Sequence, residues 1–319
     1  MEINREKLIE MYTVMVRIRV FEERVLKEFT LGNVPGFCHL YIGEEAIASA
    51  VCAALKPDDY IMSTHRGHGH VIAKGARTDR MMAELYGKKT GYNKGKGGSM
   101  HIANTEIGIL GANGVVAGGI TTAGGAALSS KLRKSGQVTI CFLGDGATNA
   151  GRFHEGANLA GAFDLPIVYI VENNGFGISV RFSDICKVKN IADRAISYGF
   201  PSVTVDGNDP VAVYEAAGEA VSRARQGQGA SMVECKTYRP RGHFIGDPQN
   251  YVTKEELKDW VSKDPIPRFR KHLLDGGIAT KAEISSIDEM INNEIDDAVK
   301  YAQDSPLPDP QDVTADMYA

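Results

Sequence analysis

The amino-acid sequence predicts an α/β fold in which a parallel sheet is flanked by helices. From Gln137 onward, short and nearly continuous apolar runs alternate with helix-like stretches, a pattern typical of strands buried on both faces of a parallel sheet. The chain has 319 residues, of which 43% are hydrophobic and 24% charged, so it can bury a large core. We therefore expect one domain over residues 1–319, with an N-terminal helical segment and a C-terminal helical tail.

The N-terminal segment is predicted to form a long amphipathic helix, which Asn4 can cap and Gly32 can end. Its apolar residues recur mostly at three- and four-residue steps: Leu8, Met11, Met15, Ile18, Val25 and Phe29. A second helix is predicted over residues 43–51, and a short strand over residues 59–63.

The regular part of the chain supplies the remaining strands of the predicted sheet. Strands are predicted over residues 138–143, 166–171, 202–205 and 231–236, with a helix between each pair, the last of these over residues 210–225. Parallel sheets bind their ligands beyond the carboxyl ends of the strands. We therefore expect the chemistry just after Leu143, Val171 and Lys236.

Two segments do not follow this alternation. Residues 91–125 are rich in glycine and show no helical periodicity until their end, so the backbone there must make close or left-handed contacts. The chain from Thr253 reads as charged helices and closes with a proline-rich segment over residues 305–310. That segment is expected to be extended and to lie on another surface.

Charge and cysteine usage exclude several classes of function. The formal charge of −4 is spread along the chain, so neither a nucleic acid nor a membrane is expected as a partner, and the ligand should be a small molecule. The five cysteines lie far apart and read as reduced, buried thiols of a cytoplasmic protein. No signal or transit segment and no run of about 20 apolar residues is found.

One pair of short motifs carries the chemical argument. Gly144-Asp145-Gly146 follows one predicted strand, and Asn173-Asn174 follows the next, so their side-chain oxygens should converge at one edge of the sheet. Mg²⁺ prefers hard oxygen ligands and takes the rest of its shell from phosphate and water. The glycines let the backbone approach a phosphate, and a helix beginning there would point free amides at it. The pair predicts a magnesium–diphosphate site.

Each motif also has an ordinary structural explanation, because Asp after a strand is a favoured helix cap and Asn-Asn-Gly is a common turn. The spacing decides between the two readings: 26 residues separate Gly146 from Asn173, which matches the thiamine-diphosphate signature. A dinucleotide fingerprint would need glycine where Asn149 stands, and the loop after Lys94 lacks the order of a P-loop. Nicotinamide and ATP are therefore disfavoured.

These residues resemble the alpha subunits of the heterotetrameric first component of 2-oxo acid and acetoin dehydrogenase complexes. The resemblance covers nearly the whole chain and implies a thiamine-diphosphate-binding fold. It is carried by residues 37–40, 63–70, 95–101, 111–116, 144–174 and 238–248.

The resemblance implies a cofactor site for thiamine diphosphate and Mg²⁺. In it, Asp145, Asn174 and the backbone carbonyl of Phe176 ligate the metal. Amides of Gly146 and Ala147 meet the diphosphate. The full implied cofactor-binding set is His65, Arg66, Gly114, Val116, Gly144, Asp145, Gly146, Ala147, Asn174, Phe176, Gly177 and His243.

Within that set, Arg66 would pair with a phosphate oxygen, and Gly114 and Val116 would contact the aminopyrimidine ring through their backbone. His65 stands where pyruvate-type members have tyrosine. Two catalytic histidines are implied: His39 faces the substrate, and His243 contacts the cofactor and assists proton transfer. For His68, His70 and His101 we expect structural hydrogen bonding.

The resemblance also implies partners. The cofactor serves as the electron sink for breaking a carbon–carbon bond, and the two-carbon fragment passes to a lipoyl group. The glutamate that activates the cofactor comes from the beta subunit in this family, so we expect an α2β2 heterotetramer that serves a lipoyl-bearing acyltransferase core, with the alpha chain inactive alone.

Acetoin is the expected substrate, because residues 243–249, Tyr251 and the compact length look closest to acetoin-cleaving members. Pyruvate and branched-chain 2-oxo acids remain alternatives. Phe244 stands where mitochondrial pyruvate-type members carry a phosphorylatable serine, which excludes that control here.

Two other classes of function remain open at this point. A metal-dependent hydrolase is suggested by His65, His68 and His70, because neutral imidazoles bind zinc. A non-catalytic scaffold subunit would keep the fold without the cofactor, although the intact Asp145 and Asn174 argue against it.

Overall fold

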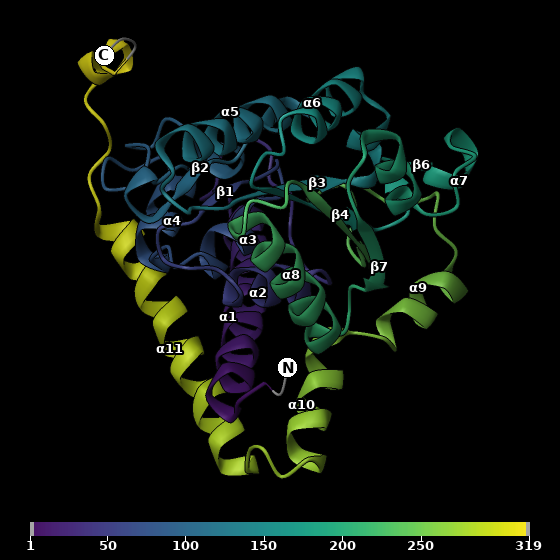
Figure 1. Cartoon of the computed structure of the whole chain (residues 1–319). Helices are drawn as coiled ribbons and strands as arrows, with labels where there is room; N and C mark the ends of the chain where they lie inside the picture. The colour runs from purple at the N-terminus through teal and green to yellow at the C-terminus, as the bar shows by residue number, and fades with distance from the viewer. Residues whose placement is uncertain (1–2, 317–319) are drawn as a thin grey trace.

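The centre of the molecule is a six-stranded, fully parallel sheet with the strand order β2-β1-β3-β4-β8-β7 (Figure 1). The structure is a computed structural model that describes residues 3–316. The strands are β1 (Tyr60–Met62), β2 (Ile109–Gly111), β3 (Thr139–Gly144), β4 (Ile167–Asn173), β7 (Ser202–Asp206) and β8 (Ser231–Lys236). The predicted α/β class is confirmed.

Alternate side chains of the central strands enter two separate cores. In β3, Ile140 and Phe142 belong to one buried cluster, whereas Cys141 and Leu143 belong to the other. Successive residues of a strand point to opposite faces, so a strand covered on both sides must be apolar at every position. This explains why the sequence shows unbroken apolar runs rather than alternation.

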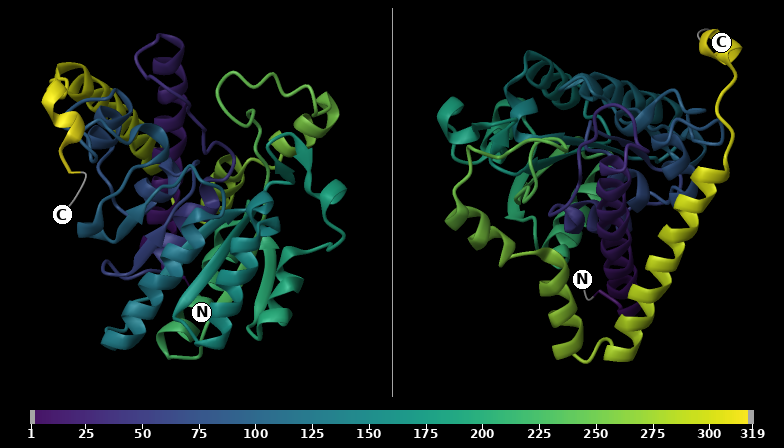
Figure 2. Two further views of the ribbon diagram at one scale, coloured as in Figure 1. Left: turned by 90° about the horizontal axis from the view of Figure 1, so that it is seen from above. Right: turned by 180° about the vertical axis from the view of Figure 1, so that it is seen from behind.

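One face of the sheet is covered by the N-terminal helices, α8 and the C-terminal helices (Figure 1). These are α1 (Arg5–Thr30), α2 (Glu45–Ala53), α3 (His68–Ala73), α4 (Thr78–Leu85), α8 (Pro210–Arg225), α10 (Pro265–Asp275) and α11 (Lys281–Asp304). Asn4 caps α1 by accepting a hydrogen bond from the Lys7 amide at 2.9 Å, as predicted. Figure 2 shows α1 running between the diverging α10 and α11.

The other face is covered by α5 (Gly118–Arg133), α6 (Gly151–Ala162) and the 3-10 helix η4 (Ile191–Tyr198). The first two helices approach closely, because a Cβ at Gly156 would lie 2.5 Å from Cγ2 of Ile120. They form the layer above the sheet in Figure 1.

The structure corrects two local predictions. The connection between β4 and β7 is not one helix: it contains the hairpin of β5 (Phe176–Gly177) and β6 (Val180–Arg181), the four-residue α7 (Phe182–Ile185), and η4. In addition, no α-helix begins at Asp145. A 3-10 helix, η3 (Asp145–Asn149), stands there, and α6 starts only at Gly151.

The glycine-rich segment contributes more regular structure than its composition suggests. It contains η1 (Gly98–Met100), η2 (Thr105–Ile107) and the edge strand β2, which was not predicted. Short edge strands carry too few residues for a period to show.

The C-terminal part contains α9 (Lys254–Val261), then α10, α11 and the 3-10 helix η5 (Pro310–Thr314). The proline-rich segment after α11 lies against the chain itself, where the carbonyl of Pro306 accepts from the Lys89 amide at 3.0 Å. Among residues 3–316, no helix combines the length and apolar character needed to cross a bilayer.

Candidate functional site

A cavity of about 370 Å³ opens at the carboxyl ends of β1, β3, β4 and β8. Its lining includes Gly144 to Ala147 after β3, Asn174 after β4 and Arg239 after β8. These are the strand ends at which the sequence predicted the chemistry.

Asp145 lies in the wall of this cavity and is 2% exposed. Its Oδ1 accepts from the amide of Gly146 at 2.7 Å, but its Oδ2 has no hydrogen-bond partner among the described residues. Burial raises the pKa of the carboxyl group to about 6. A buried carboxylate oxygen without a donor is costly unless a cation binds it, so the site has an open ligand position.

Asn174 lines the same cavity from the neighbouring strand end. Its Nδ2 donates to Oε1 of Glu44 at 2.8 Å, and its Oδ1 accepts from the amide of Phe176 at 3.2 Å. Glu44 is buried, and burial together with the charge of Glu172 raises its pKa. The asparagine amide is therefore held in one orientation from both ends.

Two glycines allow a close backbone approach in the wall of the cavity. A Cβ at Gly146 would lie 3.2 Å from Cα of Gly177, so η3 and β5 nearly touch. The next residue, Ile178, has φ of +59°, which is rare for a β-branched side chain. Such strain persists only where the surroundings hold it, and it is frequent at functional sites.

Three histidines converge beside the cavity. The ring centroids of His39 and His65 are 4.8 Å apart, and that of His243 lies 5.0 Å and 5.3 Å from them. Burial, followed by the charge of a neighbouring guanidinium, lowers the pKa of each ring: to about 3, 2 and 4, respectively. All three are neutral at physiological pH.

That guanidinium belongs to Arg66, which ties two segments of the site together. It donates to the carbonyl of Leu40 at 2.6 Å and to the carbonyl of His243 at 2.9 Å. The side chain is 4% exposed and lines the cavity. A buried, fixed positive charge at this position favours an anionic ligand.

A second buried arginine orients His243. One terminal nitrogen of Arg239 donates to Nδ1 of His243 at 3.2 Å, and the other donates to the carbonyl of Ile178 at 2.8 Å and the hydroxyl of Tyr251 at 2.9 Å. Because Nδ1 accepts, the proton of the neutral ring resides on Nε2. Nε of Arg239 has no partner among residues 3–316, which leaves it available to an anion.

The histidines predicted as a possible zinc cluster do not converge. His68 contacts Glu22 and Ser99, and His70 contacts Glu172 and Ser63, so both make structural hydrogen bonds as expected. His101 is exposed and contacts the carbonyl of Gly97 at 3.2 Å. The three histidines that do converge lie beside Arg66 and Arg239, whose charges disfavour a cation at that point.

The structure places most predicted site residues around one space. The cavity is lined by His65, Arg66, Val116, Gly144, Asp145, Gly146, Ala147, Asn174, Phe176, Gly177 and His243. His39 and Gly114 do not line it. His39 stands behind the wall with its Nδ1 unpartnered among the described residues, and Gly114 lies against the side chains of His101 and Met100.

Several cavity residues were not predicted: Glu44, Ser63, Thr64, Asn113, Glu172 and Arg239. Glu172 had a visible signal, because it is the one charged residue of the buried strand β4, and such a residue is uncommon without a function or a partner. It receives hydrogen bonds from the Tyr41 hydroxyl and, at 2.9 Å, from Nε2 of His70. Arg239 had no distinctive local signal.

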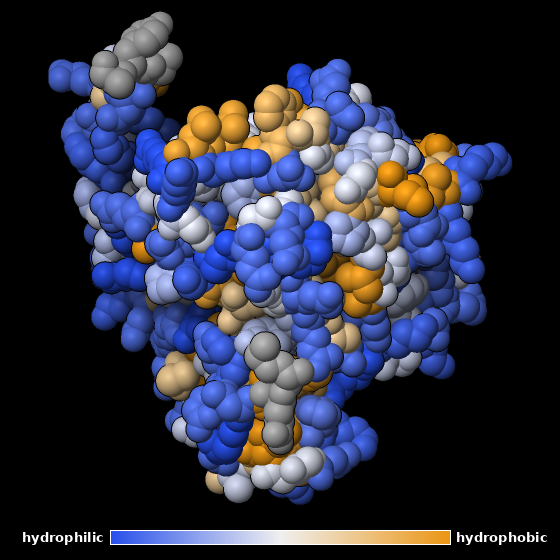
Figure 3. All heavy atoms as spheres, in the orientation of Figure 1, coloured by the Kyte–Doolittle hydropathy of each residue, from blue (hydrophilic) through white to orange (hydrophobic). Residues whose placement is uncertain are grey.

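The mouth of the cavity is apolar and open. Its lining includes Val115, Val116, Ile178, Val180 and Ile185, which are between 44% and 60% exposed. Figure 3 shows apolar residues at the surface over the β6–α7 segment. Contiguous exposed apolar surface around a site is typical of a protein-binding region.

Comparison with known proteins finds relatives along the whole chain. The family described as "Dehydrogenase E1 component" matches residues 13–311. The alpha subunit of acetoin:2,6-dichlorophenolindophenol oxidoreductase from Bacillus subtilis (strain 168) is 50% identical over 319 residues, covering 100% of this chain and 95% of the relative. Its counterpart from Cupriavidus necator is 45% identical over 317 residues, covering 99% and 95%.

Relatives that are named for another activity also match over nearly the full length. The alpha subunit of the pyruvate dehydrogenase E1 component from Porphyra purpurea is 39% identical over 324 residues, covering 99% of this chain and 94% of the relative.

Proposed function

Because this chain belongs to the dehydrogenase E1 component family, we propose that it is the alpha subunit of a thiamine-diphosphate-dependent dehydrogenase that cleaves acetoin. The observation that carries the proposal is the open ligand position at Asp145. Its free Oδ2 lines the same cavity as Asn174 and two buried arginines.

The residues present fit Mg²⁺ with thiamine diphosphate. Asp145 supplies one charged oxygen, and Asn174 and the Phe176 carbonyl supply neutral ones, a set that suits a metal whose other ligands are phosphate oxygens and water. A Cβ at Gly146 would obstruct the close approach of its backbone to Gly177. In this proposal, the diphosphate is also bound by Gly144, Ala147 and the guanidinium of Arg66. The aminopyrimidine ring is bound by Gly114 and Val116.

When bound, the cofactor supplies an electron sink for breaking a carbon–carbon bond beside a carbonyl. The chain's own part is proton control. Because Arg239 directs a donor at Nδ1, His243 presents Nε2–H as a hydrogen-bond donor. His65 lines the cavity and is held neutral beside it, so it can orient a small polar substrate without adding charge, and His39 packs against His65 from behind the wall.

Acetoin is proposed as the substrate because relatives that share 50% and 45% of their residues with this chain carry that activity in their names. Relatives named for pyruvate share 39% and 38%, which makes pyruvate the second candidate. Both groups belong to the same family, so the choice between them does not affect the cofactor site.

An alpha subunit of this family implies a beta subunit partner. We propose that this partner covers the apolar mouth formed by Val115, Val116, Ile178, Val180 and Ile185, completing an α2β2 assembly. The reaction is proposed to deliver its two-carbon fragment to a lipoyl-bearing acyltransferase core. The five cysteines are free thiols, which supports a reducing compartment such as the cytoplasm.

The proposal is tested by reconstituting the chain with its beta subunit and following dye reduction with acetoin, pyruvate and a branched-chain 2-oxo acid. We expect acetoin to give the highest kcat/KM, and activity to require thiamine diphosphate and Mg²⁺. A preference for either 2-oxo acid would overturn the substrate while leaving the cofactor proposal intact. Full activity of the alpha chain alone would contradict the proposal that the active site is shared between the two subunits.

The variant Asp145→Asn tests the metal position. It keeps the shape of the side chain but removes the carboxylate charge, so Mg²⁺-dependent activity should fall by about 100-fold or more. The same change should leave the metal-free protein at least as stable, because a buried carboxylate is replaced by a neutral amide. Unchanged magnesium dependence in the assembled variant would contradict the assignment.

A further inference from the structure

The glycine-rich segment before η1 is wrapped around one buried carboxylate. Glu84, near the end of α4, is fully buried. Its Oε2 accepts from the amides of Asn93 and Gly95 at 2.8 Å and 2.9 Å. Its Oε1 accepts from the amides of Gly97 and Gly98 at 2.8 Å and 3.1 Å. The carboxylate therefore organises four amides of a segment that has no regular secondary structure of its own.

The glycines of this loop, residues 91–98, are needed for the wrapping. A Cβ at Gly91 would lie 2.3 Å from Oε2 of Glu84, and one at Gly95 would lie 2.5 Å from the carbonyl carbon of Gly87. Gly95 and Gly98 also have φ of +78° and +59°. The loop conformation depends on Glu84 because backbone amides with left-handed neighbours form an anion-binding concavity that needs a negative charge at its centre.

The far end of the loop supports the wall of the cavity. The carbonyl of Gly97 contacts Nδ1 of His101 at 3.2 Å. The ring of His101 and the sulfur of Met100 would lie 3.4 Å and 3.7 Å from a Cβ on Gly114. The amide of Ala112 donates to the carbonyl of Ile102 at 2.8 Å. Ala112 and Gly114 therefore rest on this segment, and they flank or adjoin the cavity-lining residues Asn113 and Val115.

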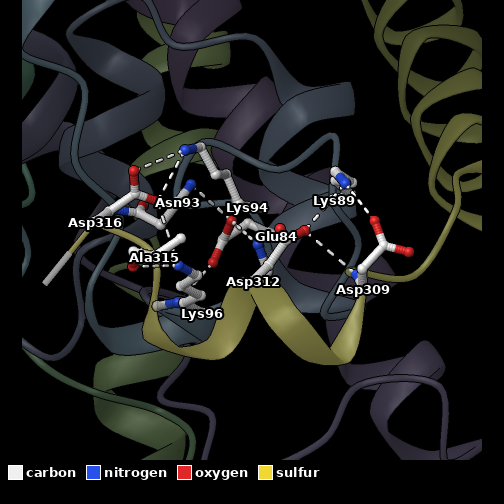
Figure 4. Close-up of polar contacts among 11 residues, drawn as sticks. Glu84, Lys89, Asn93, Lys94, Lys96, Asp309, Asp312, Ala315 and Asp316 are labelled. Atoms are coloured by element: carbon white, nitrogen blue, oxygen red, sulfur yellow. Dashed lines mark hydrogen bonds and ion pairs between the residues drawn. The ribbon is translucent and has the colours of Figure 1, made fainter.

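The same loop is also contacted from outside by the C-terminal tail (Figure 4). Lys94 and Lys96 pair with Asp316 at 2.8 Å and 3.2 Å, and Lys89 pairs with Asp309 and Asp312. All these side chains are at least 30% exposed. Exposed ion pairs contribute little and are screened by salt, so the outer contact cannot replace the buried carboxylate.

We propose that Glu84 is a positioning residue for the cofactor: by holding the four amides of the loop, it fixes the segment behind Gly114. It thereby sets the position of the neighbouring cavity residues Asn113, Val115 and Val116, where the pyrimidine end of thiamine diphosphate is proposed to bind. The inference depends on the proposed function, since it assumes that the cavity binds this cofactor.

The test compares two variants, in the assembled enzyme with its beta subunit, that each remove one negative charge in contact with this loop. Glu84→Gln keeps the size of the side chain but turns an NH₂ group toward amide donors. We expect the thiamine diphosphate concentration for half-saturation to rise about tenfold or more, with kcat at saturating cofactor within about threefold of wild type. Asp316→Asn, on the exposed side, should change neither value by more than about twofold.

A purely structural role for Glu84 would lower the melting temperature without changing the half-saturation of the assembled enzyme, and that result would overturn the proposal. If Glu84→Gln does not assemble, a second matched pair decides. Gly98→Ala and Gly277→Ala place a Cβ in open space at left-handed positions with φ of +59° and +64°, so both carry similar strain. Weakened cofactor binding in Gly98→Ala alone supports the proposal, and equal binding in the two overturns it.

The response of the wild-type enzyme to thiamine diphosphate distinguishes failure of this inference from failure of the proposed function. If wild type itself shows no saturable response to thiamine diphosphate, the proposed function fails. If wild type responds and Glu84→Gln responds equally, only the positioning role fails.

Discussion

The side-chain amide of Asn174 donates to Oε1 of Glu44 at 2.8 Å, joining the end of β4 to the start of α2 across 130 residues. With its nitrogen bound to Glu44, the amide presents its oxygen on the other side, where it accepts from the Phe176 amide. Glu44 thus selects which end of the amide can reach a metal. Such supporting contacts commonly affect metal affinity by 10–100-fold, in round figures.

This relationship predicts different effects for two substitutions of Glu44. Glu44→Gln keeps an oxygen that can accept from Asn174, so the Mg²⁺ concentration for half-maximal activity should rise by less than about threefold. Glu44→Ala leaves the amide free to turn, and the same concentration should rise by about tenfold or more. Titration of activity with Mg²⁺ measures both. Equal effects of the two changes would show that the hydrogen bond has no role.

The close approach of η3 to β5 predicts the effect of a single methyl group. In Gly146→Ala the new Cβ would lie 3.2 Å from Cα of Gly177, where the diphosphate is proposed to sit. Cofactor affinity should fall by about tenfold or more, measured by isothermal titration with the assembled enzyme. The control is Gly218→Ala in α8, whose Cβ meets no atom within 4 Å. Similar affinities for the two variants would argue against a diphosphate at this place.

The contacts of Arg239 predict that replacing it, even by lysine, lowers the activity of the enzyme. Its planar fork contacts His243, Ile178 and Tyr251 at once, whereas an ammonium group on a flexible stem cannot hold all three. Arg239→Lys should lower kcat by about tenfold or more, because the ring of His243 loses its fixed protonation state. Steady-state kinetics beside the exposed control Arg268→Lys measures the effect. A kcat equal to that of the control would remove Arg239 from the mechanism.

The lowered pKa of His39 predicts a stability that depends on pH. Burial, then the charge of Arg66, lowers its pKa to about 3, below the value of about 6.5 for an unfolded chain. The unfolded state therefore binds the proton first, and the contribution of His39 is present above about pH 6.5 and is lost as the pH falls toward 3.

Between pH 7.5 and pH 5, wild type should lose about 1 kcal/mol of unfolding free energy relative to His39→Gln, allowing for screening by water in the cavity. Chemical denaturation of both chains at the two pH values measures this difference. Parallel losses in the two chains would mean that His39 is not the group responsible.

The amino-acid sequence predicted the elements whose signals are local. The Asn4 cap, the apolar steps of α1 and the unbroken runs of β3 and β4 depend on neighbours a few residues apart, so they are visible without a structure. The connection after β4 was predicted less well. There η4 depends on packing against α6 and β8, and the hairpin strand β5 on packing against η3, rather than on a periodic pattern of their own.

The residues of the candidate site likewise fall into those that the sequence could predict and those that it could not. Asp145 and Asn174 could be predicted because each follows a strand directly, and parallel strands end at a common edge. Arg239 and Glu44 could not, because their roles depend on which distant groups they contact. His39 was predicted to face the substrate, but the structure places it behind the cavity wall beside His65 and His243.

By itself, then, the sequence determined the α/β class, the edge of the sheet at which the ligands meet, and the aspartate and asparagine at that edge, since strand periods and strand ends are short-range features. Only the tertiary structure decided that Glu44 orients Asn174, that Arg239 holds the proton of His243 on Nε2, and that Glu84 gathers four loop amides. Each of these depends on buried polar groups that need hydrogen-bond partners far away in the chain. Local sequence patterns do not indicate which distant residues those partners are.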